Sequence, residues 1–227
     1  MEKTKSQFNI AIDGPAGVGK TTIGLALAET LDARFVDTGI MYRGIAYLAI
    51  QNNILPIQLA KIIQLATETV FTLNSDDQGI ESQLMINGSL FADMLHTETV
   101  NSIVSDIAMI PEVRIPLVAW QRSIASSKRT IMVGRDITTA VLPKAELKVY
   151  LDASLEERNR RRNLQDNSQS HRMITSSTTI ASRDEIDSTR TASPLYIGSS
   201  VTRIDTTNLT FNQVYEIILN TAKAKIL

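Results

Sequence analysis

Short apolar runs alternate with longer stretches of helix-forming residues along most of the chain. The runs end at Gly or Asp and have the length of buried strands, whereas the longer stretches have the composition of helices. Strands are expected at residues 8–13, 34–37, 130–133 and 147–151, and helices at residues 21–31, 40–51, 56–68 and 98–127. This alternation favours an α/β fold in which helices flank a parallel sheet.

Prolines and capping residues mark the expected helix ends. Pro111 and Pro116 should interrupt the helical stretch at 98–127, because proline lacks the amide hydrogen that a helix interior needs. Residues 154–157 read as a capping box at the start of an arginine-rich helix. Residues 207–210, with a glutamine three positions later, offer caps for a C-terminal amphipathic helix.

The pattern changes between residues 69 and 93, where two β-prone runs are separated by turn-forming residues. The dipeptide Asn87-Gly88 is a hairpin signal. We therefore expect a small antiparallel insert at 69–93 and a core made of residues 1–68 and 94–227. Residues 166–182 are rich in Ser, Thr, Asn and Gln, which predicts a mobile surface segment.

Composition narrows the class of protein. A length of 227 residues suits one main domain, and a net charge of -1 provides no global basic field, so no nucleic-acid partner is expected. The absence of cysteine excludes disulfides and thiolate metal sites. Without a signal-peptide pattern or a run of about eighteen apolar residues, we expect a soluble, cytoplasmic protein with no membrane partner.

Residues 14–21 match the phosphate-loop pattern G-x-x-x-x-G-K-[ST] between a predicted strand and a predicted helix, as the pattern requires. In such a loop, glycines let backbone N–H groups converge on a phosphate and the lysine reaches the β- and γ-phosphates of ATP. The hydroxyl that follows can bind Mg²⁺. The expected ATP-binding residues are Gly14, Pro15, Ala16, Gly17, Val18, Gly19, Lys20, Thr21 and Thr22.

A phosphate loop alone does not separate a kinase from a GTPase or an ATP-driven switch. The sequence has no guanine-binding Asn-Lys-x-Asp pattern, which weakens the GTPase interpretation. Three further polar segments, at residues 37–43, 134–136 and 183–190, bear on the acceptor. The first two follow predicted strands, so they should lie at the same sheet edge as the loop. Taken singly, the three also fit a helix cap, a polar turn and a solvated ion-pair face.

Taken together, these segments resemble the bacterial cytidylate kinase family of P-loop nucleoside monophosphate kinases. Its members share an Asp-[Ser/Thr]-Gly-x-x-Tyr-Arg segment (here 37–43), a Gly-Arg-Asp turn (134–136) and an Arg-Asp-x-x-Asp-x-x-Arg lid helix (183–190). The resemblance covers nearly the whole chain. It implies transfer of the γ-phosphoryl group of ATP to CMP or dCMP, a lid at about 157–190, and a monophosphate-binding insert at 69–93.

The resemblance also implies roles for individual residues. The expected substrate-binding residues are Ser105, Arg114 and Asp136 at the cytosine edge, Arg183 and Asp187 near the sugar, and Thr38, Arg43, Arg135 and Arg190 at the acceptor phosphate. Thr21 and Asp37 are the expected Mg²⁺ residues, Asp37 through a water. The expected catalytic residues are Lys20, Arg135, Arg190, Arg158 and Arg162, with a plain surface role left open for the last two. No general base is expected, because a phosphate acceptor is already ionised.

Three positions depart from the family pattern. Val133 stands where an acidic residue is usual, Thr138 where glycine is expected, and Ile186 where the lid carries an arginine. A lost arginine matters for the acceptor, since a charged hydrogen bond contributes roughly 1.5–3 kcal/mol. Two alternatives stay open: another small-molecule kinase on the same scaffold, and an ATP-binding regulator that has lost transfer. We expect a monomer.

Overall fold

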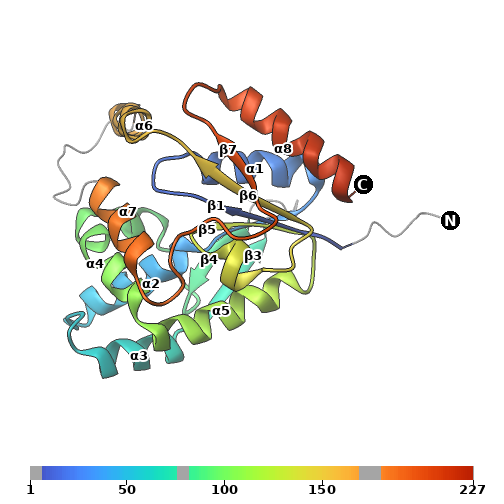
Figure 1. Ribbon diagram of the computed structural model, residues 1–227. Helices are drawn as coiled ribbons and strands as arrows, with labels where there is room; N and C mark the ends of the chain where they lie inside the picture. Colours follow the sequence, from blue (N-terminus) through green and yellow to red (C-terminus); the bar gives the residue numbers. More distant parts are fainter. Residues whose placement is uncertain (1–6, 76–81, 169–179, 227) are drawn as a thin grey trace.

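The computed structural model describes residues 7–75, 82–168 and 180–226, and a five-stranded sheet forms its centre (Figure 1). The strands are β1 (Asn9–Asp13), β2 (Arg34–Asp37), β5 (Thr130–Gly134), β6 (Leu147–Asp152) and β7 (Thr202–Asp205). Their order is β2-β5-β1-β6-β7, and every neighbouring pair is parallel. The predicted parallel sheet is confirmed. The edge strand β7 escapes the sequence pattern because Ile204 is its one buried residue and its four residues form no apolar run.

Helices cover both faces of the sheet. They are α1 (Lys20–Leu31), α2 (Gly39–Gln51), α3 (Leu59–Glu68), α4 (Glu98–Met109), α5 (Pro111–Ala125), α6 (Leu155–Ser168), α7 (Ile180–Thr189) and α8 (Phe211–Ile226), with short turns η1 (Ala92–His96) and η2 (Ile137–Val141). In β1, Ile10 and Ile12 pack with residues of α1 and α8, whereas Ala11 packs with residues of α5 (Figure 1). Because β1 is buried on both faces, the loop that follows it is anchored at its start by a well-packed strand.

A second apolar core lies beside the sheet, where α2 packs against α3, α4, α5 and a small antiparallel pair of strands. This pair, β3 (Phe71–Ser75) and β4 (Ser82–Ile86), lies within the segment for which an antiparallel insert is expected. It approaches α2 closely at Gly44, where an added Cβ would stand 2.5 Å from Ile86 Cδ1. Within the described residues, no helix is long and apolar enough to cross a membrane.

Two local turns differ from the prediction. Asn87 and Gly88 form a tight turn with positive φ angles of 50° and 77°, but it closes Ile86 onto Ser89 after β4 and does not join β3 to β4. The connection between those strands, residues 76–81, lies outside the described residues. The third helix begins at Leu59 and not at residue 56, because the Gln58 side chain accepts the Leu55 amide at 2.9 Å and holds a turn before it.

Prolines and caps also act differently from the pattern in places. Pro111 starts α5, whereas Pro116 lies inside this helix without ending it. Ser154 Oγ accepts the Glu157 amide at 3.2 Å, but the reciprocal half of the capping box is lost because the Ser154 amide donates to Thr207. The C-terminal helix has the cap that the sequence offers, with a reciprocal pair between Thr210 and Gln213.

The polar segment at 166–182 is divided in the structure. Its ends belong to α6 and α7, and residues 169–179 lie outside the described residues. The prediction of a mobile segment therefore stays a prediction.

Close packing at Gly24 of α1 gives a stability prediction. A Cβ at Gly24 would stand 2.6 Å from Phe35 Cε2 and 2.9 Å from Val133 Cγ1. Alanine ordinarily stabilises a helix interior by about 1 kcal/mol relative to glycine, whereas overpacking a core costs about 1–3 kcal/mol. We expect Gly24→Ala to lower the free energy of unfolding in urea by about 1–2 kcal/mol. The loss should shrink in a Phe35→Leu background, and an unchanged or higher stability of the single variant would contradict the packing argument.

Candidate active site

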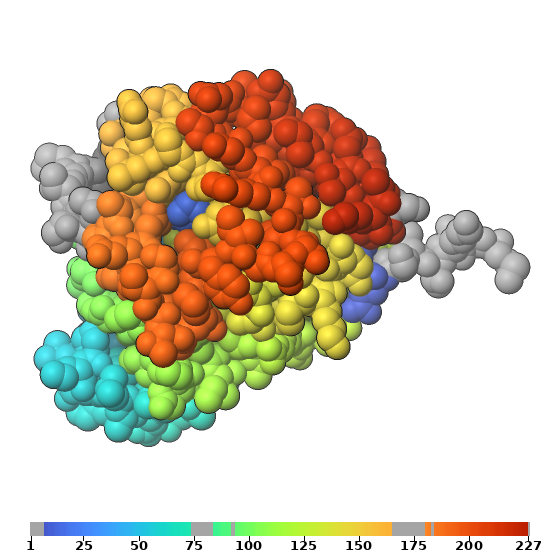
Figure 2. Space-filling model, viewed as in Figure 1, coloured from blue at the N-terminus to red at the C-terminus, as the bar shows by residue number. Residues whose placement is uncertain are grey.

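A cleft of about 760 Å³ opens at the carboxyl ends of β1, β2 and β5. Its walls come from the loop after β1, the start of α2, α4, the turn after β5, and helices α6 and α7. Figure 2 shows a hollow bordered by the yellow and orange segments of α6 and α7, with blue N-terminal residues visible inside it. Small-molecule sites measure roughly 300–1,000 Å³, so the cleft has the size of a ligand site.

The loop after β1 has the backbone of a phosphate-binding loop. Gly14, Gly17 and Gly19 have positive φ angles of 152°, 76° and 95°, and a Cβ at Gly14 would stand only 2.2 Å from the Leu151 carbonyl oxygen. The first helix starts directly after the loop, so its positive dipole end points at the cleft. This arrangement can hold an anion.

Lys20 is a buried cation within this loop. Its Nζ donates to the Gly14 carbonyl at 2.7 Å and to the Pro15 carbonyl at 2.8 Å. Burial, and then the nearby Arg135 guanidinium, lower the pKa of Lys20 well below its usual value. A phosphate beside Lys20 would favour its charged form.

Thr21 and Asp37 place two oxygen donors side by side at the cleft. The Thr21 hydroxyl donates to Asp37 Oδ2 at 2.8 Å, and Asp37 Oδ1 accepts the Gly39 amide at 3.0 Å. Asp37 therefore also satisfies the first amide of α2, which agrees with the helix-cap interpretation of this segment. Hydroxyl and carboxylate oxygens are the ligands that Mg²⁺ prefers, so this donor pair fits that ion.

Arg114 and Asp136 form a buried ion pair on the opposite side of the cleft, with only 5% and 4% of each residue exposed. The Arg114 guanidinium also lies 5.3 Å above the centre of the Tyr42 ring. Arg190 Nη2 approaches the other carboxylate oxygen of Asp136 at 3.7 Å. The turn after β5 is thus more than an ordinary polar turn, because its carboxylate is held between two arginines.

A second ion pair continues this cluster. Arg135 Nε donates to Asp187 Oδ2 at 2.7 Å, and Arg190 Nη1 lies 3.8 Å from Asp187 Oδ1. Burial opposes the charge of Arg135, but the combined attraction of Asp187, Asp184 and Asp37 outweighs it, so the pKa of Arg135 is raised. Burial and then repulsion by Arg114 lower the pKa of Arg190. The alternative interpretation of this segment, a solvated ion-pair face, is therefore wrong for Asp187 and Arg190, because both residues are buried.

The remaining predicted substrate residues line the same cleft, apart from Arg183, whose side chain lies outside the described part of the structure. Arg43 donates to Asn101 Oδ1 at 2.6 Å and to the Leu95 carbonyl at 3.1 Å. The Thr38 hydroxyl donates to the Val133 carbonyl at 3.0 Å. Ser105 is half-buried on α4 among the lining residues.

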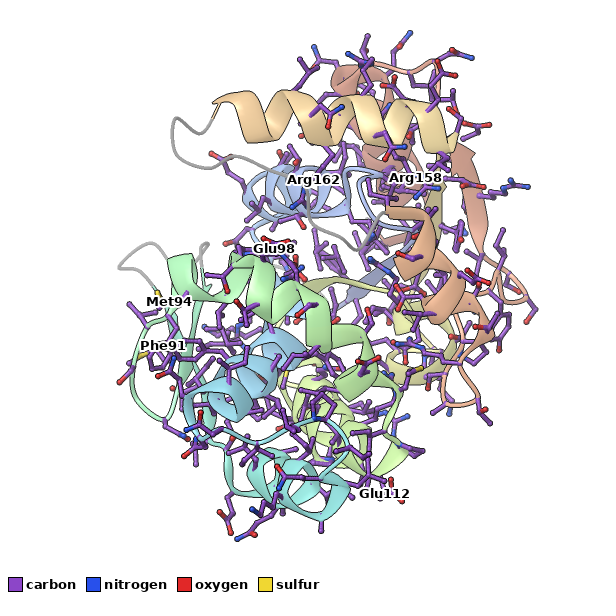
Figure 3. All side chains as sticks on the ribbon, turned by 90° about the vertical axis from the view of Figure 1, so that its left-hand side faces the viewer. Phe91, Met94, Glu98, Glu112, Arg158 and Arg162 are labelled. Atoms are coloured by element: carbon purple, nitrogen blue, oxygen red, sulfur yellow. The ribbon has the colours of Figure 1, made fainter. Side chains whose placement is uncertain are left out.

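The arginines of α6 separate into different roles. Arg158 is 8% exposed; it pairs with Asp184 of α7 and donates to the Ala16 carbonyl at 3.1 Å. Asp184 also accepts the Ala16 amide at 3.1 Å, so α6 and α7 both hold the phosphate loop. A plain surface role is therefore wrong for Arg158. In Figure 3, Arg158 and Arg162 lie on the side of α6 that faces the rest of the molecule, and Arg162 is an exposed residue of the cleft wall.

The sequence analysis gave no site role to four residues that shape the site: Asp13, Asn101, Arg161 and Asp184, although Asp184 belongs to the motif at 183–190 and Arg161 to the arginine-rich helix. Arg161 also lines the cleft and donates to the Thr206 carbonyl at 2.7 Å. Asp13 had a visible signal, as an acidic residue ending an apolar strand directly before the phosphate loop. Asn101 had none, because its role follows only from the folding of α4 against α2.

Two departures from the family pattern have structural explanations. The Val133 side chain packs in the core against α1 and does not line the cleft. Thr138 is buried, and its amide donates to Asp13 Oδ2 at 2.7 Å, so the turn remains anchored without glycine. The third, Ile186, is half-buried on α7.

Known proteins resemble this chain in sequence and in fold. Residues 10–224 match the family model described as cytidylate kinase. The cytidylate kinase of Geobacillus sp. (strain WCH70) is 37% identical over 98% of this chain and 99% of its own length. The cytidylate kinase of Lysinibacillus sphaericus (strain C3-41) is 40% identical over 98% and 100%. A shikimate kinase structure from Bacteroides thetaiotaomicron, 11% identical, gives a TM-score of 0.50 over 96% of this chain and 99% of that chain, which shows a shared fold alone. The chain belongs to the cytidylate kinase family.

Proposed function

We propose that this protein transfers the γ-phosphoryl group of ATP to CMP or dCMP, which gives CDP or dCDP. The observation that carries this proposal is the buried Arg114–Asp136 pair, which faces the same cleft as the phosphate loop. A carboxylate beside a guanidinium matches the cytosine edge, which presents an amino donor next to acceptors. Membership of the family supports the same reaction.

ATP occupies the loop side of the cleft in this proposal. The backbone N–H groups of residues 16–22 surround its β-phosphate, and Lys20 turns from the loop carbonyls to the β- and γ-phosphates. Mg²⁺ would be held by Thr21 and, through a water, by Asp37, and when bound it neutralises phosphate charge. The structure supports this placement through the close contact of the two side chains.

The acceptor occupies the opposite side. Asp136 accepts the cytosine amino group, while Arg114 and Ser105 contact the neighbouring acceptors of the base. Arg183 and Asp187 approach the sugar. This division is supported by burial, because a base that contacts the Arg114–Asp136 pair from the cleft would be shielded from water.

Charge neutralisation and alignment then carry the transfer. Arg43, Arg135 and Arg190, with the Thr38 hydroxyl, hold the acceptor phosphate, whose oxygen attacks the γ-phosphorus as the bond to the β-phosphate oxygen breaks. Arg162, which lines the cleft, stabilises the negative charge on the transferred group, and Arg158 would join it after leaving Asp184. A general base is unnecessary, since the acceptor is already ionised. A monomeric state and a cytoplasmic location stay predictions.

An acceptor panel tests the proposed reaction. ADP release is measured with ATP, Mg²⁺ and each of CMP, dCMP, UMP, AMP, GMP and shikimate in turn. We expect turnover on CMP and dCMP, which stops when EDTA removes the metal. Preferred turnover on another acceptor would show that the protein is a kinase of different specificity on the same scaffold. ATP binding without any acceptor-dependent ADP release would identify a regulator.

Lys20 is expected to be essential for transfer. Lys20→Ala removes the cation that neutralises the β- and γ-phosphates, and loss of one such group lowers kcat by about 10²–10³-fold. The circular dichroism spectrum should stay unchanged, because the Lys20 ammonium group donates to the Gly14 and Pro15 carbonyls of the loop and supports no helix or strand. The exposed residue Lys128 gives the control, since Lys128→Ala should keep full turnover. Near-normal turnover of Lys20→Ala would contradict the proposed phosphate-loop mechanism.

Asp136 is expected to set base choice. Asp136→Asn keeps the shape of the side chain but adds an amide donor, which suits the 4-oxo group of uracil better than the 4-amino group of cytosine. The ratio of kcat/KM for CMP over UMP should therefore fall by about tenfold or more. Asp106→Asn, on the exposed face of α4, should leave this ratio unchanged. If Asp136→Asn keeps the wild-type ratio, the carboxylate does not contact the base.

A further inference from the structure

Asp13 is a fully buried carboxylate, 0% exposed. It takes no part in the proposed contacts with ATP or with the acceptor. It is the last residue of β1 and directly precedes Gly14 of the phosphate loop. Burying a charge in this way is costly unless hydrogen bonds compensate it. The partners of Asp13 therefore indicate what its charge is for.

Both oxygens of Asp13 accept backbone amides from the turn after β5. Oδ1 accepts the Ile137 amide at 2.8 Å, and Oδ2 accepts the Thr138 amide at 2.7 Å. These two residues directly follow Arg135 and Asp136 in the chain. One side chain thus fixes the far end of the segment that carries two of the proposed acceptor-binding residues.

The near end of that segment is fixed by the sheet. Gly134 is paired with Asp13 in the parallel register of β1 and β5. Residues 135 and 136 are therefore held between a sheet pair on one side and the Asp13 carboxylate on the other. A small movement of the Ile137 or Thr138 amide would move the Asp136 side chain relative to Arg114.

A carboxylate suits this task better than any neutral side chain. It presents two acceptors and no donor, which matches two adjacent amides, whereas an asparagine would turn a donor toward one of them. Burial raises the pKa of Asp13, and the bonds from Thr138 and Ile137 oppose that shift by favouring the ionised form.

We propose that Asp13 is a positioning residue that ties the start of the phosphate loop to the turn bearing Arg135 and Asp136, and so aligns the acceptor with ATP. The inference rests on the proposed function for the identity of the acceptor. Asp13 itself is not among the residues that line the cleft. Its loss should therefore weaken use of the acceptor while leaving the affinity for ATP in place.

Steady-state kinetics of Asp13→Asn test this role. A charged hydrogen bond contributes roughly 1.5–3 kcal/mol, which corresponds to a change of about tenfold or more. We expect KM for CMP to rise by about tenfold, KM for ATP to stay within about twofold, and the preference for CMP over UMP to fall. Asp13→Ser, which keeps one acceptor oxygen and adds no amide, should shift the same constants in the same direction.

A matched control comes from the neighbouring strand. Asp152 ends β6 as Asp13 ends β1, but its carboxylate bonds Arg203 and the Ala153 amide away from the acceptor residues. Asp152→Asn should keep all these constants at wild-type values. A purely structural role of Asp13 would instead lower apparent kcat in step with the folded fraction, with KM for CMP unchanged.

Two results would overturn the inference. One is an unchanged KM for CMP in folded Asp13→Asn, and the other is failure of both Asp13 variants to fold, which would leave Asp13 a stability residue alone. The acceptor in this test is the one that the wild-type protein uses in the panel. Failure of CMP as a substrate and failure of Asp13 as a positioning residue thus give different results.

Discussion

A chain of alternating charges, buried except at the half-buried Arg135, holds together the side of the cleft opposite the phosphate loop. It runs from Arg114 through Asp136, Arg190 and Asp187 to Arg135, and each neighbour in it carries the opposite charge. Any one of these charges would be expensive to bury alone, so each depends on the others. The arginines outnumber the aspartates, which leaves an excess positive charge suited to a phosphate ligand. The rest of the fold must bring α5, α7 and the turn after β5 within ion-pair distance.

Helix α7 connects this chain of charges to the phosphate loop. Asp187 faces the acceptor residues, while Asp184, three positions earlier, bonds Arg158 and the Ala16 amide. Residues three apart lie on the same side of a helix, so one helix face reaches both halves of the cleft. The sequence of α7 is mostly polar, and its docking therefore relies on these ion pairs more than on an apolar core.

The departures from the family pattern fall into two kinds. Val133 is a core residue of β5, and Thr138 keeps its backbone bond to Asp13, so neither disturbs the geometry of the turn. Ile186 lies on the lid helix itself, where an arginine would have added a positive charge. In the proposed function, the missing positive charge would weaken phosphate binding.

The sequence by itself determined the elements whose signals are local. The phosphate loop, the parallel sheet and the order of the polar segments follow from short motifs and apolar runs, because backbone conformation and burial leave marks within a few residues. Only the tertiary structure decided which charges are buried and paired, such as Arg158 with Asp184. It also showed that Asp13 bonds residues more than a hundred positions away. Which charged residues become partners depends on how distant elements pack together. Buried ion pairs leave no periodic pattern in a single sequence, so the sequence could not predict them.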